Sequence, residues 1–337
     1  MNKVVHSKLC SSEQRSTPNG LQHFPLITVA ITCFNAESTI ERAISSGLNQ
    51  TWPNLEVLVV DDGSTDNSLD ILACKSVTDE RIRIVKHSIN RGCAKARNTL
   101  IAAAKGEFVA FFDDDDVSLP DRLQLQYDCI ISHEKRLAVK LVACYASGQR
   151  IYPNGYVFPL RAVGSYGTPP EGLIMVNYLL FNKRQANIFY GAGTPTCSLM
   201  ARADVFRNLE GFDPLMRRQE DVDFAVRLGF KGGHFIGISE PVLNQYATIG
   251  NEKSALIEFE STLRLLDKNI DYLKGAGTYH YMRLWSEMRF LHFSGRDARA
   301  FTILLRLALR YPLRTLKHFS SSAIRRFYHE QRMKATV

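Results

Sequence analysis

Short apolar runs alternate with amphipathic segments over the first third of the chain. β-branched and other apolar residues cluster in runs too short for helices, whereas the segments between them place apolar residues at helical spacing. Strands are predicted at 26–32, 55–60, 82–86 and 108–112, and helices from a Ser38-x-x-Glu41 capping box, near 65–74 and over 91–104. Four strands alternating with three helices predict an α/β fold with a parallel sheet and crossover helices.

The pattern becomes less regular after residue 117. Ser118 and Pro120-Asp121 favour a helix start, and Leu123 and Ile130 are expected to face inward. Further elements are predicted as a strand at 137–145, a hairpin at 150–158 around Pro-Asn-Gly, a strand at 196–202, a helix at 220–230 and a strand at 234–238. We expect long binding loops at 160–196 and helices alone beyond about residue 255.

The composition is that of an ordinary globular protein. The chain has 337 residues, of which 45% are hydrophobic and 23% charged, enough for one large or two ordinary domains. The first 25 residues are polar, and we expect a flexible tail there. Seven cysteines without a C-x-x-C pair argue against a disulfide framework or a zinc site. With no apolar run long enough to span a bilayer, we expect a cytoplasmic protein.

Positive charge is concentrated near the C-terminus. Residues 280–337 contain twelve Lys and Arg and three acidic residues, so the rest of the chain is close to neutral. This asymmetry favours an anionic surface over a nucleic-acid partner. In 299–310, Arg299, Arg306 and Arg310 form one stripe, and the apolar residues Phe301, Leu304, Leu305 and Ala308 lie opposite. That apolar face is expected either to dock on the rest of the protein or to lie in a membrane interface, which makes 299–334 a candidate for peripheral membrane contact.

Three polar clusters follow predicted strands. They are Thr32 to Asn35, Asp61 to Ser64 and Asp113 to Asp116. In a parallel sheet, ligands collect where the strands end, so these clusters are expected to meet at one crevice. Asp61 to Ser64 can accept hydrogen bonds from a base or ribose, or they can form a plain turn. The acidic run Asp113 to Asp116 taken alone can also be only a solvated loop.

The four consecutive aspartates indicate a divalent cation. In an extended loop, Asp113 and Asp115 would point to one side and Asp114 and Asp116 to the other. Paired carboxylates suit Mg²⁺ or Mn²⁺, which keep coordination positions for phosphate oxygens. Because the chain has neither a P-loop nor a G-x-G-x-x-G motif, carboxylates and a metal are expected to bind the phosphates.

Four ordered motifs resemble the family-2 inverting glycosyltransferases of GT-A fold. They are ITVAITCFNAESTIERAISSGLNQTWPNLEVLVVDDGSTDNS, NRGCAKARN, GEFVAFFDDDDVSLPDRL and GFDPLMRRQEDVDFAVRL, within about residues 25–245. The resemblance implies a mostly parallel, Rossmann-like sheet flanked by helices. It also implies a GT-A domain over 26–250, divided into a nucleotide-sugar-binding half (26–117) and an acceptor-binding half (118–250). A helical, basic C-terminal extension (251–337) would follow the flexible tail (1–25) and this domain.

The resemblance also implies roles for individual residues. Donor binding is assigned to Thr32, Phe34, Asn35, Glu37, Asp62, Arg97, Asp113 and Asp114. Asp115 and Asp113 would form the DxD motif that holds Mn²⁺ or Mg²⁺, although an aspartate at its middle position, Asp114, is unusual for the family. Arg97 is otherwise explained as a charge on a helix surface.

Glu220 and Asp221 match the family's acidic pair. Asp221 would be the catalytic base, because a sugar hydroxyl needs a proton acceptor as it attacks, and Glu220 would lie on the acceptor side. Acidic residues in the first turn of a helix also interact well with its dipole without any other role. The implied reaction moves one sugar from a nucleotide-diphosphate sugar, usually a UDP-sugar, to a glycan or lipid-linked acceptor in cell-surface polysaccharide synthesis.

Three other functions stay open at this level. A sugar-nucleotide pyrophosphorylase would need a Gly-rich, basic loop after the first strand, which Thr32 to Ser38 lacks. A metal-dependent phosphohydrolase would use the aspartates without a sugar acceptor. An inactive nucleotide-sugar-binding protein would not depend on Asp221.

Overall fold

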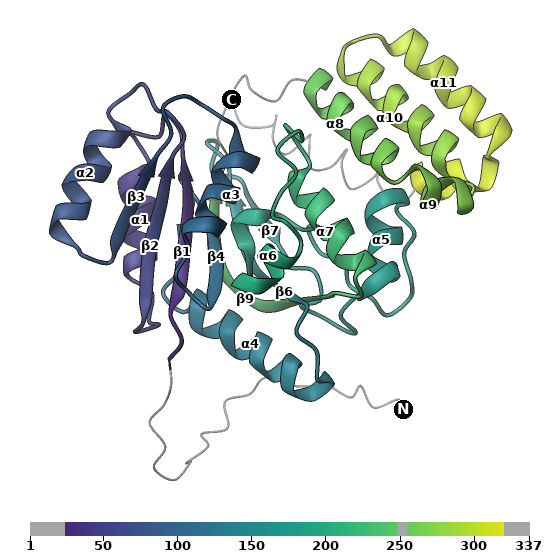
Figure 1. Ribbon diagram of the computed structural model, residues 1–337. Coiled ribbons are helices and arrows are strands. Elements are labelled where there is room, and N and C mark those ends of the chain that lie inside the picture. The colour runs from purple at the N-terminus through teal and green to yellow at the C-terminus, as the bar shows by residue number, and fades with distance from the viewer. Residues whose placement is uncertain (1–23, 248–254, 320–337) are drawn as a thin grey trace.

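The computed structural model describes residues 24–247 and 255–319 (Figure 1). In the first part, four strands alternate with three helices, as the apolar pattern predicts. The elements are β1 (Ile27–Cys33), α1 (Ile40–Leu48), β2 (Leu55–Asp61), α2 (Ser68–Thr78), β3 (Ile82–Lys86), α3 (Cys93–Ala103) and β4 (Phe108–Asp113). Most of the predicted tail, residues 1–23, lies outside the described residues.

The second part adds shorter strands and more helices. They are β5 (Val117–Ser118), α4 (Arg122–Leu137), β6 (Val142–Ile151), β7 (Val157–Leu160), α5 (Gly172–Phe181), β8 (Leu199–Arg202), α6 (Ala203–Asn208), α7 (Glu220–Phe230) and β9 (His234–Tyr246), with a 3₁₀ turn at Thr196–Ser198. The hairpin at 150–158 is confirmed, because β6 and β7 pair antiparallel with Ile151 opposite Val157. The helix α5 corrects the prediction of loops throughout 160–196.

All strands belong to one nine-stranded sheet. Its order is β3-β2-β1-β4-β8-β6-β9-β5, and β7 pairs with β6. The strands β1 to β4 are parallel, whereas β8 runs antiparallel to β4 and β6. Thr32 pairs with Asp113 of β4 and Cys33 with Asp61 of β2, so the three strands end at one level. This mostly parallel sheet flanked by helices confirms the predicted fold class.

Apolar side chains cover both faces of the sheet. On one face, Ala30 and Val60 pack in a cluster with Leu100 of α3, Phe206 of α6 and Phe224 of α7. On the other face, the buried residues of β1 and β2 pack against α1, α2 and α4. Burial on both faces explains why these strands are continuous apolar runs rather than alternating ones.

In the described residues after the sheet, 255–319, the secondary structure is helical throughout, as predicted. Figure 1 shows α8 (Ala255–Lys268), α9 (Ile270–Gly275), α10 (Tyr279–Phe293) and α11 (Asp297–Arg310) at the end of the molecule opposite β3 and α2. Leu265, Leu266 and Leu273 pack against Val176 of α5 and Val226 of α7. Residues 312–319 form a further helical segment. Within the described residues, no helix is both long enough and apolar enough to cross a bilayer.

Two local predictions need correction. The Ser38-x-x-Glu41 box does not cap α1, because the cap residue is Thr39 and no side chain caps this end; instead, the backbone N–H groups of Thr39 and Ile40 bond to the Ala36 carbonyl. In α11, the face that packs on α10 consists of Ala300, Ile303 and Leu307. Phe301 and Leu305, which the sequence places on the same apolar face, lie outside this contact and are exposed, so the docking alternative does not hold for them.

A buried glutamate joins the elements at the other end of the parallel strands. The Glu56 carboxylate of β2 accepts hydrogen bonds from the Thr28 hydroxyl (2.6 Å), the Arg83 guanidinium (2.6 Å) and the Lys105 N–H (2.8 Å). Burial alone would raise the pKa of Glu56, but these donors together lower it below the usual value. Glu56 therefore connects β1, β2, β3 and the segment before β4.

We predict that Glu56→Gln lowers the free energy of unfolding by about 1–3 kcal/mol at pH 7, because an amide cannot accept all three bonds and leaves a donor unsatisfied. Urea unfolding measures this change. The pKa of Glu56 is lowered in the fold, so its contribution is present above the pKa of an unfolded glutamate and declines as the pH falls below it. Glu80→Gln, at an exposed position, is the matched control. Equal unfolding midpoints for the two variants would contradict the prediction.

Candidate active site

A cavity of about 710 Å³ opens where β1, β2 and β4 end. Of the residues predicted for the site, eight line it: Thr32, Phe34, Asp62, Arg97, Asp113, Asp114, Asp115 and Glu220. They come from five separate segments, so the sheet, α3 and α7 do bring the predicted clusters together. Asn35, Glu37 and Asp221 are not among the lining residues.

The aspartate run is not extended after β4. Asp114 and Asp115 form a turn, in which the Asp116 N–H bonds to the Asp113 carbonyl (3.4 Å). As a result, Asp113, Asp114 and Asp115 all line the cavity, which corrects the expected alternation of side chains. Asp114 accepts a hydrogen bond from the Phe34 N–H (3.1 Å). Burial raises its pKa to about 7, and Asp113 and Asp115 act in the same direction.

Arg97 connects the aspartate run to α7. Its guanidinium is buried, donates a hydrogen bond to Glu220 and lies 3.8 Å from the Asp113 carboxylate. The alternative prediction of a helix-surface charge is therefore wrong. Burial raises the pKa of Asp113, whereas the charge of Arg97 lowers it. Arg97 thus compensates two carboxylates that the chain separates by more than one hundred residues.

A second buried arginine lies behind the aspartates. Arg122, the first residue of α4, donates to the Phe111 carbonyl (2.8 Å) and the Ser118 hydroxyl (2.8 Å). Asp116 points away from the cavity and accepts a bond from the Tyr246 N–H (3.1 Å). Burial raises the pKa of Asp116 to about 8, and Asp113 adds to this effect. Asp116 thus ties the aspartate turn to β9, while Arg122 ties α4 to β4.

Asp62 shapes the loop that leads into α3. Its buried carboxylate accepts hydrogen bonds from the N–H groups of Arg91 (3.0 Å) and Gly92 (2.8 Å) and contacts His87 Nδ1 at 2.6 Å. Gly92 has a φ of +88°, which favours glycine at this position. Asp62 therefore borders the cavity while its oxygens already hold the loop that carries Arg91.

Asn35 and Glu37 join two loops to each other. The Asn35 side chain accepts a bond from the Thr65 N–H (2.9 Å), and the Glu37 carboxylate accepts one from the Asn67 N–H (3.0 Å). In return, the Ser64 hydroxyl accepts the Asn35 N–H (3.0 Å). These bonds fix the segment after β1 against the segment after β2. Both predicted donor-binding side chains thus lie next to the cavity and are engaged with the chain itself.

The acidic pair begins α7. Gln219 precedes it with a φ of +61° and donates to the Thr262 hydroxyl of α8 (2.6 Å). The Asp221 carboxylate accepts the N–H of Val222 (2.8 Å). Burial raises the pKa of Asp221 to about 7, Glu220 acts in the same direction, and Arg97 opposes them. Asp221 is therefore a carboxylate that can accept a proton near neutral pH.

The oxygen atoms around the cavity suit a hard divalent cation. Among the described residues, one group has possible ligand atoms within 4.8 Å of one another: Asp113, Asp116 and Cys197. Burial raises the pKa of the Cys197 thiol well above its usual value, and the neighbouring Asp113 and Asp116 add to this, so the thiol stays protonated. Asp113 to Asp115 offer oxygen ligands at the cavity itself, and such ligands fit Mg²⁺ or Mn²⁺.

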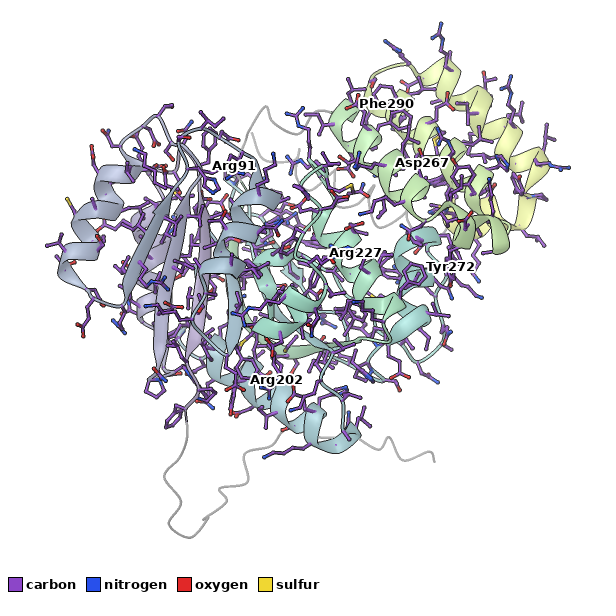
Figure 2. All side chains as sticks on the ribbon, viewed as in Figure 1. Arg91, Arg202, Arg227, Asp267, Tyr272 and Phe290 are labelled. Carbon is purple, nitrogen blue, oxygen red and sulfur yellow. The ribbon has the colours of Figure 1, made fainter. Side chains whose placement is uncertain are left out.

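Three further arginines, which the sequence analysis did not single out, also line the cavity. Arg91 follows β3, and Arg217 and Arg218 precede α7. Figure 2 shows Arg91 at one end of the sheet and Arg202 at the other, beside α4. Arginines suit phosphate oxygens because their planar donors pair with two oxygens at once. Arg217 and Arg218 belong to the MRRQED stretch, in which the sequence analysis assigned a role only to Glu220 and Asp221.

Comparison with known proteins identifies the family. The profile described as glycosyl transferase family 2 matches residues 28–206, which is more than half of the chain. The chain belongs to this family. The resemblance found in the four motifs is thereby confirmed, and the protein is a glycosyltransferase.

The relatives differ in how much they share with this chain. EpsE of Bacillus subtilis (strain 168) is 29% identical over 216 residues, which are 62% of this chain and 69% of EpsE. The Escherichia coli enzyme UDP-Glc:alpha-D-GlcNAc-diphosphoundecaprenol beta-1,3-glucosyltransferase WfgD is 37% identical over 108 residues, 32% of this chain and 42% of WfgD. The chain thus spans just over two thirds of one relative and less than half of the other.

Solved structures support the fold. Residues 1–349 of S. aureus TarS in complex with UDP give a TM-score of 0.57 at 21% identity, covering 80% of this chain and 72% of that one. The same TarS fragment with UDP-GlcNAc gives 0.56 at 19% identity, covering 86% and 78%. At this identity, the likeness supports the GT-A type of fold and not a particular substrate.

We predict that Arg97→Lys lowers kcat/KM for sugar transfer about 10- to 100-fold, because one ammonium cannot hold both Asp113 and Glu220 in position. The measurement is nucleotide release from a panel of nucleotide sugars, and the donor that the unmodified protein uses fastest serves for both variants. Arg202→Lys is the matched control, since Arg202 also joins two carboxylates, Glu134 and Glu107, but at the other end of the sheet. If both variants lost the same activity for the same loss of stability, Arg97 would have no special role in the site.

Proposed function

We propose that the protein transfers one sugar from a nucleotide-diphosphate sugar to a hydroxyl of a glycan or lipid-linked acceptor, with inversion at the anomeric carbon. The observation that carries this proposal is the position of Arg97 between Asp113 and Glu220, which unites the end of β4 with the start of α7 at one cavity. A UDP-sugar is the preferred donor, since the TarS structures were solved with UDP and UDP-GlcNAc. The names of relatives such as chondroitin synthase and hyaluronan synthase, both of Pasteurella multocida, favour a role in polysaccharide synthesis.

Donor binding is assigned to the cavity wall. Thr32, Phe34 and Asp62 border the nucleoside, while Asn35 and Glu37 hold the loops beside it. Asp113 and Asp115 would hold Mn²⁺ or Mg²⁺, and Asp114 would lie beside the ribose. When bound, the cation would supply Lewis-acid stabilisation of the negative charge on the leaving diphosphate. Arg91 and Arg217 line the same cavity and supply further positive charge to the phosphates.

Asp221 is the proposed base. It accepts the proton of the acceptor hydroxyl as that oxygen bonds to the anomeric carbon, and the nucleoside diphosphate leaves from the opposite side. A positioned carboxylate of this kind contributes about 10²- to 10⁴-fold to the rate. Glu220 is engaged by Arg97 and therefore orients the acceptor side instead of taking the proton.

The proposal also covers where the acceptor binds and where in the cell the enzyme acts. The acceptor is proposed to bind at the N-terminus of α7, where Glu220 lines the cavity. A lipid-linked acceptor would place the enzyme at the cytoplasmic face of a membrane, with peripheral contact through 299–334. Residues 299–319 of this segment are described, and 320–334 lie outside the described residues. The exposed Phe301 and Leu305, on a helix that also carries the exposed Arg306, support this contact.

We predict that Asp221→Asn lowers kcat at least 100-fold while nucleotide binding persists, because the amide cannot accept the proton. In the unmodified protein, the rate should fall as the pH drops below about 7, since protonated Asp221 is inactive as a base. Glu220→Gln should move this decline to lower pH, because it removes the charge that raises the pKa of Asp221. Full transfer activity in Asp221→Asn would assign the base to another residue. Binding of a nucleotide sugar without any transfer by the unmodified protein would leave only a role in nucleotide-sugar binding.

We also predict that Asp115→Asn removes most of the extra thermal stabilisation that Mn²⁺ gives in the presence of UDP. A ligand that binds only the folded protein stabilises it, by about 2.7 kcal/mol when its concentration is 100 times Kd. This stabilisation raises the melting temperature. Asp128→Asn, on the exposed face of α4, is the control and should keep the full effect. Unchanged stabilisation of Asp115→Asn would place the metal elsewhere. Phosphate release without a sugar acceptor would instead favour a phosphohydrolase.

A further inference from the structure

A second cavity, of about 930 Å³, lies away from the candidate active site. It is bordered by the C-terminal end of α5, by α9 and by the helical segment 312–319. The Tyr272 hydroxyl donates to the Asn177 side chain (2.7 Å) and joins α9 to α5 at its wall. Figure 2 shows Tyr272 where the C-terminal helices meet α5. The two cavities share no lining residue.

Positive charge dominates this second cavity. Lys183, Arg184, Arg314 and Lys317 line it, and Asp271 is the one acidic residue among its described lining residues. Two of the cations are held in place. Arg184 lies 4.9 Å from the ring centre of Tyr178, and Arg314 donates to the Gly277 carbonyl (2.9 Å). Such an arrangement attracts an anion and requires little ordering when the anion binds.

Exposed leucines continue from the cavity onto the surface. Leu313 lines the cavity and is 83% exposed, and Leu316 is 69% exposed. Leu309, at the end of α11, is 77% exposed, and Phe301 and Leu305 precede it on the same helix. An apolar surface next to a basic cavity has the two features of an anionic phospholipid, a phosphate headgroup and acyl chains.

We propose that this cavity binds the phosphate headgroup of an anionic phospholipid while Leu313 and Leu316 enter the headgroup–acyl boundary. This inference builds on the peripheral membrane contact proposed above and does not depend on the transfer reaction. It adds Lys183 and Arg184, which lie more than one hundred residues before the contact segment 299–334. Charge complementarity favours this occupant over a second copy of the chain, whose corresponding surface carries the same positive charge.

The test is co-sedimentation of the full chain with vesicles of equal parts phosphatidylglycerol and phosphatidylcholine at low salt. Lys183→Glu/Lys317→Glu should lower the partition coefficient at least tenfold, because each cation near an anionic surface contributes about 1 kcal/mol. Lys105→Glu/Lys135→Glu is the matched control, with the same change in net charge at exposed positions outside the cavity. Leu313→Gln/Leu316→Gln should weaken binding without altering the salt dependence.

Several results would overturn the proposal. Equal losses for the cavity and control variants would mean that only net charge matters. Thermal stabilisation by inorganic phosphate without vesicle binding would make the cavity a site for soluble anions. Light scattering that shows a dimer, converted to monomer by Leu313→Gln/Leu316→Gln, would make the leucines a subunit interface. Vesicle binding is measured separately from sugar transfer, so a failure here leaves the proposed reaction untouched, and an inactive enzyme that binds vesicles leaves this proposal intact.

Discussion

The pairing of Arg97 with Asp113 and Glu220 is the interaction on which the candidate site depends. Arg97 lies on α3, Asp113 ends β4 and Glu220 begins α7, so one buried guanidinium fixes three elements that are distant in sequence. Two like charges about 4 Å apart repel by about 4 kcal/mol at the effective dielectric of a protein surface, so neighbouring carboxylates need a cation between them. With Arg97 on one side of the aspartate turn and Arg122 on the other, the acidic groups can converge on one cavity. In the proposed reaction, a metal ion and the arginines that line the cavity would offset the remaining negative charge when a diphosphate binds.

Burial gives the acidic residues of this site different properties. Asp114 and Asp221 both have a pKa raised to about 7, chiefly by burial, yet their partners differ. Asp114 accepts the Phe34 N–H at the end of β1, whereas Asp221 bonds to the next N–H of its own helix. The first carboxylate is thereby tied to the wall of the donor cavity, and the second lies at the start of the helix that borders the proposed acceptor. A separation of this kind is what a reaction needs in which one group of acids binds the leaving group and another acid accepts a proton.

The sequence was sufficient for the first half of the fold, because the strands there are buried on both faces and stand out as apolar runs between amphipathic helices. The sequence did not predict α5, because this helix is apolar around much of its circumference and therefore lacks the helical period of apolar and polar residues. Both α7 and the C-terminal helices cover α5. In the site, the aspartates at the ends of β2 and β4 were found because they follow apolar strands, and Glu220 and Asp221 were found because they match the family's acidic pair. The arginines that line the cavity were harder to predict. Arg91 and Arg217 reach the cavity from loops whose positions depend on tertiary bonds, such as those of Asp62 to the N–H groups of Arg91 and Gly92, and no local pattern encodes these.

The C-terminal helices connect the two cavities mechanically. Val176 and Leu180 of α5, Val226 of α7 and Leu265 and Leu266 of α8 form one buried apolar cluster. The helix α7 carries Glu220 and Asp221 at its start, while Lys183 and Arg184 follow the end of α5. Gln219 adds a polar link from the start of α7 to Thr262 of α8. Because packed apolar layers resist shear, a membrane that held the headgroup cavity would also fix the orientation of α7. In the proposed reaction, that constraint would present the base at a constant height above the bilayer, which suits an acceptor whose own lipid anchors it in the same plane.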